Sequence, residues 1–478
     1  MADPRRRRRR PGGQPPAPRP RVDAARLAAY EVCRAVRVDE AYTNLVLPHV
    51  LARHGLSGRD AGFATELAAG TLRRRGTYDA VLAACVDRPL AKVEVKVLDV
   101  LRLGAHQLLA MRVPPHAALS ATVDLARSVI GPGAAGFVNA VLRRVSEADL
   151  ATWVRRVAPD PATDPWGFAA VAHSHPRWVV EALAAALGGG GGVADGVEDG
   201  AGDELEALLS ADNEPPRVVL VARPGRAEVA ELPGEPTRWS PYGVVLGSGD
   251  PSAVPAVAEG RAGVQDEGSQ LVALALARAA VDGRDERWLD LCAGPGGKAA
   301  LLAGLAAGAG ARLVANERQP HRAGLVRRAL RGADGVEGVV VADGTQPPWP
   351  SGSFDRVLVD APCTGLGALR RRPESRWRRT PQDVTALAPL QRALLSAAID
   401  SVRPGGVVVY ATCSPVLAET RDVVTDVLAA RSDARLEDAS SLWPDVPDCV
   451  GPLPGTLQLW PHRHATDAMF VALLRRTG

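Results

Sequence analysis

The second half of the chain alternates between short apolar segments and longer stretches with helical periodicity, and no other feature restricts the fold as strongly. The alternation begins after residue 265 and is typical of βαβ units that build a parallel sheet. We expect five strands, at residues 287–291, 312–316, 338–342, 355–359 and 407–411. Because parallel strands bring their carboxyl ends to one edge of a sheet, the residues that follow these strands are predicted to meet in one ligand site of an α/β fold.

Residues 22–146 have a different pattern, in which apolar side chains recur at spacings of three and four. Short breaks at glycine and proline divide this stretch, so we predict an all-helical domain. Residues 147–260 are expected to hold a helical connector, a Gly-rich acidic insertion and a small α+β unit. The α/β domain then covers residues 261–478.

Positive charge is concentrated at the N-terminus. Residues 1–22 contain eight arginines and one acidic residue, whereas the whole chain has 57 Lys and Arg against 54 Asp and Glu. Residues 1–21 are too polar to bury a core, so we expect a disordered Arg/Pro-rich tail. This tail either binds a polyanion by counterion release or is solvated without a specific role.

Composition argues against several classes of protein. No segment approaches about 20 uncharged apolar residues, so we expect a cytoplasmic protein that does not cross a membrane. The six cysteines include no CxxC pair, which argues against a disulfide scaffold or a zinc ribbon. The nine histidines show no ligand spacing beyond His462 and His464, which we interpret as surface-loop residues, so no metal is expected.

The first predicted strand leads directly into a glycine-rich loop and then into a helix. Glycine is needed where the backbone approaches a ligand, and a helix start offers free N–H groups and positive potential. The spacing differs from the GxGxxG of a dinucleotide fold and suits a small nucleoside cofactor; a tight turn without a ligand is the alternative. The loop residues are Cys292, Ala293, Gly294, Pro295, Gly296, Gly297 and Lys298.

Acidic residues stand at the ends of the next three strands. Glu317 follows Lys298 by nineteen residues, where a carboxylate can accept hydrogen bonds from both ribose hydroxyls. Asp343 and Asp360 are further candidates for cofactor contact, and Asp360 alternatively faces the substrate base. Arg322, five residues after Glu317, is a candidate for contact with the cofactor or with a phosphate.

Two cysteines, Cys363 and Cys413, follow the last two predicted strands. The motifs that surround them, with the glycine-rich loop, resemble the bacterial Sun/RsmB branch of the RNA cytosine-C5 methyltransferases. The motifs are Cys292–Lys298, Asp360–Gly367, Arg370–Glu374 with Arg376-Trp377, and Ala411–Pro415, and the segments Gln265–Gln270 and Asp467–Phe470 also fit. Gly294 and Glu317 stand where alanine and aspartate are commoner in that family.

The helical front end is similar to the NusB-like RNA-binding domain. The segments that carry this resemblance are Arg59–Ala61, Leu72–Arg75, Leu101–Leu108, Pro114–Ala118 and Val138–Arg144. Together the two resemblances imply a helical RNA-binding domain joined to a Rossmann-like domain that uses S-adenosylmethionine to methylate C5 of a cytosine in 16S ribosomal RNA. The implied partner is this RNA, naked or in an early particle, with no obligate protein partner.

The family resemblance also implies roles for the two cysteines. Cytosine C5 is too poor a nucleophile to take a methyl group until a thiolate adds at C6. Cys413 is implied as that nucleophile, and Cys363 as the group that assists release. Two alternatives stay open: Cys363 is the nucleophile, as in DNA cytosine methyltransferases, or the chain is a non-catalytic RNA-binding ribosome-assembly factor with a vestigial cofactor fold.

Residues 370–379 are strongly basic and include Trp377. Enzymes that modify RNA must splay the target base out, so we expect this segment to contact phosphates and to stack on a base. The alternative for individual arginines is a solvated surface position.

Overall fold

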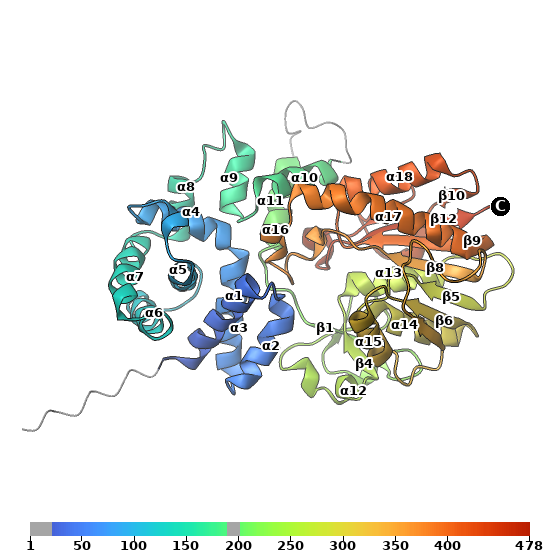
Figure 1. Ribbon diagram of the computed structural model, residues 1–478, viewed down its shortest axis with the longest axis horizontal. Helices are drawn as coiled ribbons and strands as arrows, with labels where there is room; N and C mark the ends of the chain where they lie inside the picture. Colours follow the sequence, from blue (N-terminus) through green and yellow to red (C-terminus); the bar gives the residue numbers. More distant parts are fainter. Residues whose placement is uncertain (1–21, 189–200) are drawn as a thin grey trace, which may run out of the picture.

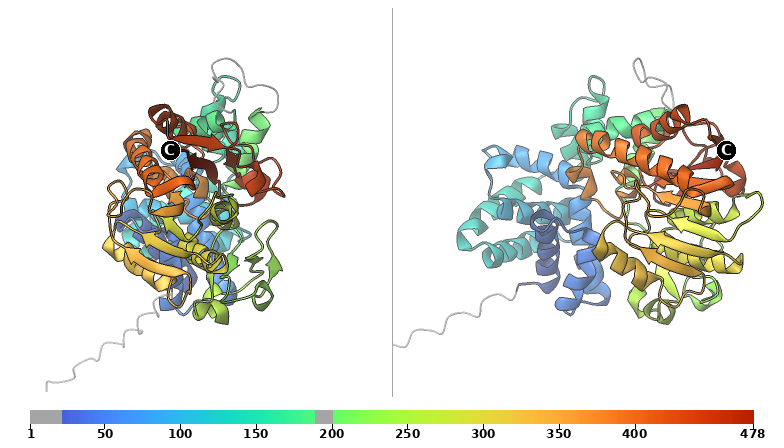
Figure 2. Two further views of the ribbon diagram at one scale, coloured as in Figure 1. Left: turned by 90° about the vertical axis from the view of Figure 1, so that its right-hand side faces the viewer. Right: turned by 45° about the vertical axis from the view of Figure 1, so that its right-hand side comes forward.

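The computed structural model describes residues 22–188 and 201–478 (Figure 1). The predicted N-terminal tail and most of the Gly-rich insertion lie outside these residues. A helical part and an α/β part lie side by side, with α10 (Arg177–Leu187), α11 (Ala201–Ala211) and α16 (Ser375–Arg378) where they meet (Figures 1 and 2).

The helical part is built around α5 (Val95–Leu109), whose residues from Val97 to Gln107 are all buried. Because α5 is buried on every side along this stretch, neighbouring helices must cover it all round. They are α1 (Ala24–Val38), α3 (Gly58–Arg73), α4 (Arg75–Cys85), α6 (Pro115–Val129) and α7 (Pro132–Val145), whereas α2 (Thr43–Arg53) packs on α1 and α3. Pro115 and Pro132 each begin a helix, where the missing N–H costs nothing. The predicted helical N-terminal fold is confirmed.

Connecting helices and a small sheet follow. The helices are α8 (Leu150–Val157), α9 (Pro165–Ala172), α10 and α11. The sheet is antiparallel, in the order β2-β3-β1-β4, and comprises β1 (Val219–Ala222), β2 (Glu235–Pro236), β3 (Gly243–Val245) and β4 (Ala262–Val264), with α12 (Pro255–Ala258) beside it. The predicted α+β unit is therefore present as a small sheet with one short helix.

The large sheet has the strand order β10-β12-β9-β8-β5-β6-β7, and β11 pairs with β12. Five of its strands are parallel and correspond to the five that the sequence predicts: β5 (Arg287–Asp290), β6 (Arg312–Asn316), β7 (Val336–Val340), β8 (Phe354–Asp360) and β9 (Val402–Thr412). The prediction missed three antiparallel strands, β10 (Ala434–Glu437), β11 (Leu457–Gln458) and β12 (Phe470–Arg476). The Rossmann-like α/β class is confirmed, with a mixed sheet.

Alternating residues of the central strands enter two separate cores. In β9, Val407 and Val409 pack with α13 (Glu267–Arg278) and α14 (Gly297–Gly308), whereas Val408 and Tyr410 pack with α17 (Pro381–Ser401) and α18 (Arg421–Ala430). Because successive side chains of a strand point to opposite faces, this division defines three layers with helices on both sides of the sheet. The remaining helices are α15 (Pro320–Ala329) and α19 (Pro461–His464).

Within the described ranges 22–188 and 201–478, no helix is both long and apolar enough to cross a bilayer.

Candidate active site

The glycine-rich loop connects β5 to α14 and lies against the end of β6. Ala293 N–H donates to the carbonyl of Asn316 at 2.8 Å, which ties the loop to the neighbouring strand. Gly296 has φ 112°, and a Cβ there would meet Ala329 at 2.7 Å, so glycine is required at this position. At Gly294 a Cβ would overlap the carboxylate of Glu317. The structure therefore brings the loop and Glu317 together, as predicted.

Glu317 follows β6, is 5% exposed, and accepts a hydrogen bond from Gln319 N–H at 2.8 Å. Arg322 lies on the same side, since its Nη2 donates to the carbonyl of Gly294 at 2.6 Å and its Nη1 is 3.6 Å from Glu317 Oε2. Asp343 follows β7, but its contacts are local, to Thr345 at 2.8 Å and Arg318 at 3.6 Å. Of the predicted cofactor residues, Asp343 is the one that makes no hydrogen bond with the loop or with Glu317.

Asp290, at the end of β5, is a buried carboxylate that the sequence analysis did not single out. Its Oδ1 accepts from Cys292 N–H at 3.3 Å, and its Oδ2 is buried without a hydrogen-bond partner. Burial, assisted by the nearby charge of Asp360, raises the pKa of Asp290 to about 8. The glycine-rich loop has the unpaired Oδ2 of Asp290 and the carboxylate of Glu317 beside it. This arrangement fits a nucleoside that carries hydroxyl and ammonium donors.

The two cysteines that follow β8 and β9 are in contact, with 3.4 Å between Sγ of Cys363 and Sγ of Cys413. Backbone hydrogen bonds join the two loops on either side of the thiols. Ala361 N–H donates to the carbonyl of Ala411 at 2.9 Å, and Gly367 N–H donates to the carbonyl of Cys413 at 2.8 Å. Both thiols are partly buried, so this pair is held in place and remains reachable.

The environment of the pair distinguishes the two thiols. The hydrogen bond from Cys363 lowers the pKa of Cys413 against the opposing effect of burial, and Lys298 lowers it further. The same hydrogen bond, together with burial, raises the pKa of Cys363 well above its usual value. Lys298 Nζ lies 3.0 Å from Asp360 Oδ2 and 3.3 Å from Ser269 Oγ, which keeps a positive charge beside the sulfurs. The positive charge of Lys298 thus favours a thiolate at Cys413.

The basic segment after Cys363 does not have the exposed role that the sequence predicts. Trp377 packs against Gly76, with the Arg75 guanidinium 5.8 Å from its ring centroid, and is not free to stack on a base. Arg371 is paired with two buried carboxylates, at 2.5 Å from Asp266 and 3.2 Å from Asp467. The expectation of RNA contact was wrong for these residues. A run of arginines suggests an exposed surface, because the sequence does not show which distant acceptors will lie beside it in the fold.

This segment instead anchors the α/β part to the helical part. Arg376 is fully buried and donates to the carbonyls of Arg73, Ser174 and Asp212 and to the side chain of Asn213, at 2.9 to 3.3 Å. Glu374 accepts from both N–H and Oγ1 of Thr43, at 3.0 and 2.6 Å. Arg378 donates to three carbonyls at the end of α1, those of Val36, Glu40 and Ala41. The loop that carries Cys363 is thus continuous with the contact between the two parts.

The interpretation of His462 and His464 as surface residues was also wrong. His464 is 3% exposed and accepts from Trp460 N–H at 2.9 Å, and His462 is 3.1 Å from Glu204. Among residues 22–188 and 201–478, no group of three His, Cys, Asp or Glu side chains is arranged to hold a metal ion.

Comparison with known proteins identifies relatives of both parts. The profile of the family described as 16S rRNA methyltransferase RsmB/F matches residues 279–475, and the NusB family profile matches residues 23–147. A Mycobacterium tuberculosis protein, named only as a methyltransferase, is 53% identical over 98% of this chain and 99% of its own. The ribosomal RNA small subunit methyltransferase B of Pseudomonas syringae is 33% identical over 86% of this chain and 88% of its own.

Solved structures share the fold. The crystal structure of PH0851 has a TM-score of 0.75 at 22% identity and covers 95% of this chain and 99% of its own. A methyltransferase homologue from Pyrococcus horikoshii has a TM-score of 0.51 at 20% identity and covers 66% of this chain and 100% of its own. These similarities support the arrangement of the α/β part.

Proposed function

Because the chain belongs to the 16S rRNA methyltransferase RsmB/F family and uses S-adenosylmethionine, we propose that it methylates C5 of a cytosine through a covalent bond between Cys413 and C6. The observation that carries this proposal is the 3.4 Å contact between Cys413 and Cys363, in which one thiol has a lowered pKa and the other a raised one. A non-catalytic assembly factor would have no need of two thiols with opposite acidities in contact beside a buried lysine.

S-adenosylmethionine supplies the methyl group, and we assign its binding to the loop Cys292–Lys298 with Glu317 on the ribose. Glu317 suits this role because it is nearly buried yet has one carboxyl oxygen, Oε2, that accepts no hydrogen bond from any residue in the described ranges 22–188 and 201–478. Arg322 holds the loop in place through the carbonyl of Gly294, at 2.6 Å. Asp343 is assigned to the edge of the same site.

The protein side chains divide the covalent chemistry between them. The Cys413 thiolate, stabilised by the Cys363 thiol and by Lys298, adds at C6 and makes C5 able to attack a methyl group. Once the Cys413 sulfur is bonded to carbon, its hydrogen bond and its charge no longer raise the pKa of Cys363, so the Cys363 thiol can release its proton to water and, as a thiolate, take the C5 proton. Departure of the Cys413 sulfur then restores the ring. Asp360, held by Lys298 at 3.0 Å, is placed to orient the cytosine edge.

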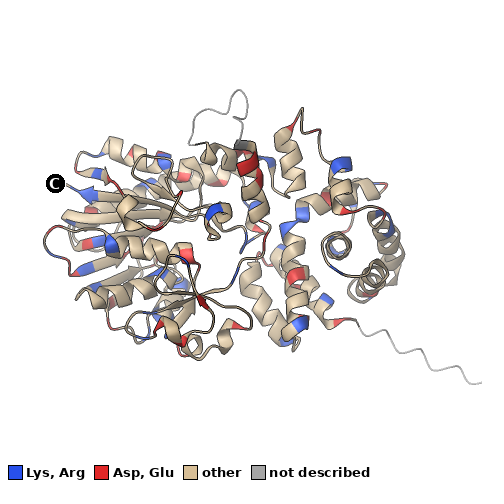
Figure 3. Cartoon of the chain, turned by 180° about the vertical axis from the view of Figure 1, so that it is seen from behind, with Lys and Arg blue, Asp and Glu red and all other residues tan. Residues whose placement is uncertain are grey.

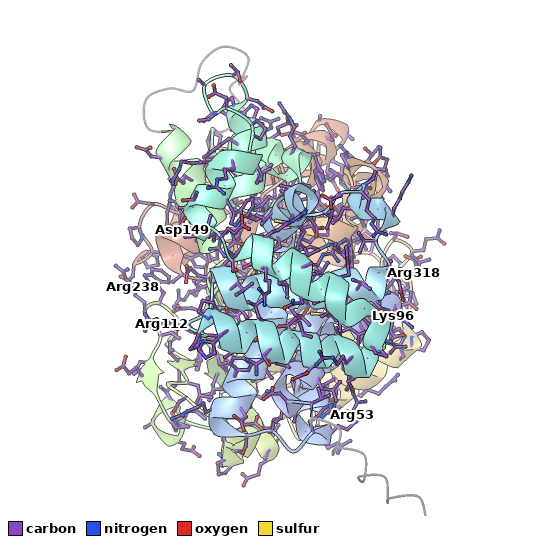
Figure 4. The ribbon with its side chains drawn as sticks, turned by 90° about the vertical axis from the view of Figure 1, so that its left-hand side faces the viewer. Arg53, Lys96, Arg112, Asp149, Arg238 and Arg318 are labelled. Carbon is purple, nitrogen blue, oxygen red and sulfur yellow. The ribbon has the colours of Figure 1, made fainter. Side chains whose placement is uncertain are left out.

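The helical part is proposed to supply affinity for the ribosomal RNA, naked or in an early particle, in the cytoplasm. Its exposed basic residues include Arg53, Lys96 and Arg112, which are spread around the end of the molecule seen in Figure 4. Arg143 and Arg144 are also exposed at the end of α7. Figure 3 shows both basic and acidic residues scattered over the two parts, so we expect shape to guide binding together with charge. The proposed domains are residues 22–146, 147–260 and 261–478.

A denaturing gel with target RNA and S-adenosylmethionine tests the roles of the cysteines. Cys413→Ser should abolish methylation and covalent attachment, because an alcohol offers almost no anion at neutral pH. Cys363→Ser should accumulate a denaturant-resistant protein–RNA adduct. An adduct that forms only when Cys413 is replaced would make Cys363 the nucleophile, and the absence of methylation and adduct from every form, wild type included, would favour the assembly factor.

A further inference from the structure

The two cysteine loops are joined beneath the thiols by one buried carboxylate, that of Glu419. This residue ends a short turn, Leu417–Glu419, between β9 and α18, and it is 0% exposed. We propose that Glu419 is the positioning residue that sets the separation of Cys363 and Cys413. The importance of this separation for catalysis rests on the proposed function. The part that Glu419 plays in setting the separation does not depend on that function.

Glu419 binds the residue that follows each cysteine. Its Oε1 accepts from Thr364 N–H at 2.8 Å, and its Oε2 accepts from the Thr364 hydroxyl at 2.5 Å. Its Oε2 also accepts from the Ser414 hydroxyl at 2.6 Å. Because Thr364 is adjacent to Cys363 and Ser414 is adjacent to Cys413, a movement of either loop must break a hydrogen bond to this carboxylate.

Hydrogen bonds from α17 and β9 hold Glu419 itself in place. Gln391 of α17 donates to Glu419 Oε1 at 3.1 Å and to the carbonyl of Pro362 at 2.9 Å. The hydroxyl of Tyr410, within β9, donates to the backbone carbonyl of Glu419 at 2.8 Å. The support of the thiols therefore extends from Glu419 into the core between the sheet and α17.

A charged carboxylate is required because four donors converge on it. The two oxygens of a carboxylate offer about four lone-pair sites, which match the donors of Thr364, Ser414 and Gln391. The amide of glutamine would replace one acceptor oxygen by an NH₂ group that faces other donors. A buried donor left without a partner is costly, so the loops should shift to relieve it. Glu419 accepts no hydrogen bond from either thiol, which distinguishes it from a catalytic residue.

The rate at which Cys363 and Cys413 form a disulfide measures their separation without RNA or S-adenosylmethionine. Diamide removes one hydrogen from each thiol, forms the S–S bond and is itself reduced to the hydrazine. We expect Glu419→Gln to slow this reaction by about tenfold or more, as the loss of a hydrogen bond to a charged group implies. The product is detected as a loss of thiol labelling at both cysteines by mass spectrometry.

Asp355→Asn is the matched control. Asp355 is also 0% exposed and also accepts several hydrogen bonds, but it lies near the opposite end of β8 from Cys363. Its replacement should cost stability while leaving the rate of disulfide formation within about twofold, because none of its hydrogen bonds reaches a cysteine loop. Disulfide formation at the wild-type rate in folded Glu419→Gln would overturn the proposal.

Ser414→Ala provides a second variant if Glu419→Gln does not fold. It removes one donor and leaves the carboxylate in place, so slower disulfide formation is again expected, and an unchanged rate would count against the proposal. In the gel assay, Glu419→Gln should give less adduct and less product than wild type. If Cys363→Ser gives no adduct but Glu419→Gln still slows the disulfide, the proposed chemistry fails and the positioning role stands.

Discussion

Gly294 leaves the space that the carboxylate of Glu317 occupies. A Cβ at position 294 would overlap Oε2 of Glu317 and lie 3.0 Å from Cζ of Arg322. The resemblance to the RNA cytosine-C5 methyltransferases implies alanine and aspartate as the commoner residues at these two positions. Relative to that pair, this chain has one carbon fewer at position 294 and one carbon more in the acidic side chain at position 317. The two differences therefore compensate for each other sterically.

The first prediction is that these two positions are energetically coupled. Gly294→Ala alone should weaken S-adenosylmethionine binding by about 1–3 kcal/mol, because the added methyl group displaces Glu317. Adding Glu317→Asp should recover most of that loss, giving a coupling free energy between about 0.5 and 3 kcal/mol by calorimetry. Gly308→Ala, at the far end of the helix α14 that follows the loop and with open space at its Cβ, is the control and should bind normally. Additive losses in the double variant would contradict the coupling.

The second prediction concerns Glu317 itself. Glu317→Ala should weaken S-adenosylmethionine binding by about 1–3 kcal/mol, the cost of leaving the ribose hydroxyls without their acceptor. Asp343→Ala should have a smaller effect, because the side chain of Asp343 contacts Thr345 and Arg318 and not the loop. Calorimetry measures both, and unchanged affinity in Glu317→Ala would reject the assignment of this residue to the ribose.

The site could be predicted from the sequence wherever its residues directly follow a strand. The five parallel strands bring the glycine-rich loop, Glu317, Asp360 and the two cysteines to one sheet edge, and local apolar patterning is enough to locate those strands. β12 was missed because it pairs antiparallel with β9 and so lies outside the βαβ alternation on which the prediction of the strands was based. Periodicity shows that a segment is a strand, but not which strand it joins.

Buried charge was the main source of error. Arg376 and Glu374 were read as part of an exposed basic run because their partners, Arg73, Ser174 and Thr43, are between about 200 and 330 residues away in the chain. The role of Glu419 could not be predicted from the sequence for a similar reason, because the donors that it binds lie on three separate elements. The sequence alone does not show whether a charged side chain will be solvated by water or will bind groups of the folded chain.

The third prediction follows from the hydrogen bond between the two thiols. Cys363→Ala removes the donor that chiefly lowers the pKa of Cys413, so the pKa of Cys413 should rise and its alkylation by iodoacetamide at neutral pH should slow. The pH profile of alkylation, read by mass spectrometry, should shift toward higher pH. Cys33, whose pKa is strongly raised by burial, should stay unreactive in both forms and serves as an internal control. A profile that does not move would mean that Lys298 alone sets the acidity of Cys413.

The fourth prediction is that Arg376 is a main stabiliser of the contact between the two parts. Arg376→Ala should lower the free energy of unfolding by about 3 kcal/mol or more, because it leaves several buried acceptors without a donor. Arg112→Ala, at an exposed position, should have little effect. Urea denaturation measures both variants. Equal stabilities would show that water can replace Arg376, and the α/β part would then be expected to tolerate removal of residues 22–146.

The fifth prediction is a pH dependence of stability that comes from Asp290. Burial raises its pKa to about 8 in the folded chain, above an unfolded value of about 3.9, so the folded state holds a proton that the unfolded state has lost. The contribution of this group to stability is therefore fully present below about pH 4 and declines as the pH rises toward 8. Asp290→Asn cannot ionise and should lose less stability than wild type between pH 6 and pH 9 in urea denaturation without S-adenosylmethionine.

Asp334→Asn, at an exposed carboxyl, should follow the wild-type curve. If Asp290→Asn also follows it, the carboxyl of Asp290 is ionised in the folded chain across this range, and Lys298 rather than a proton compensates its charge.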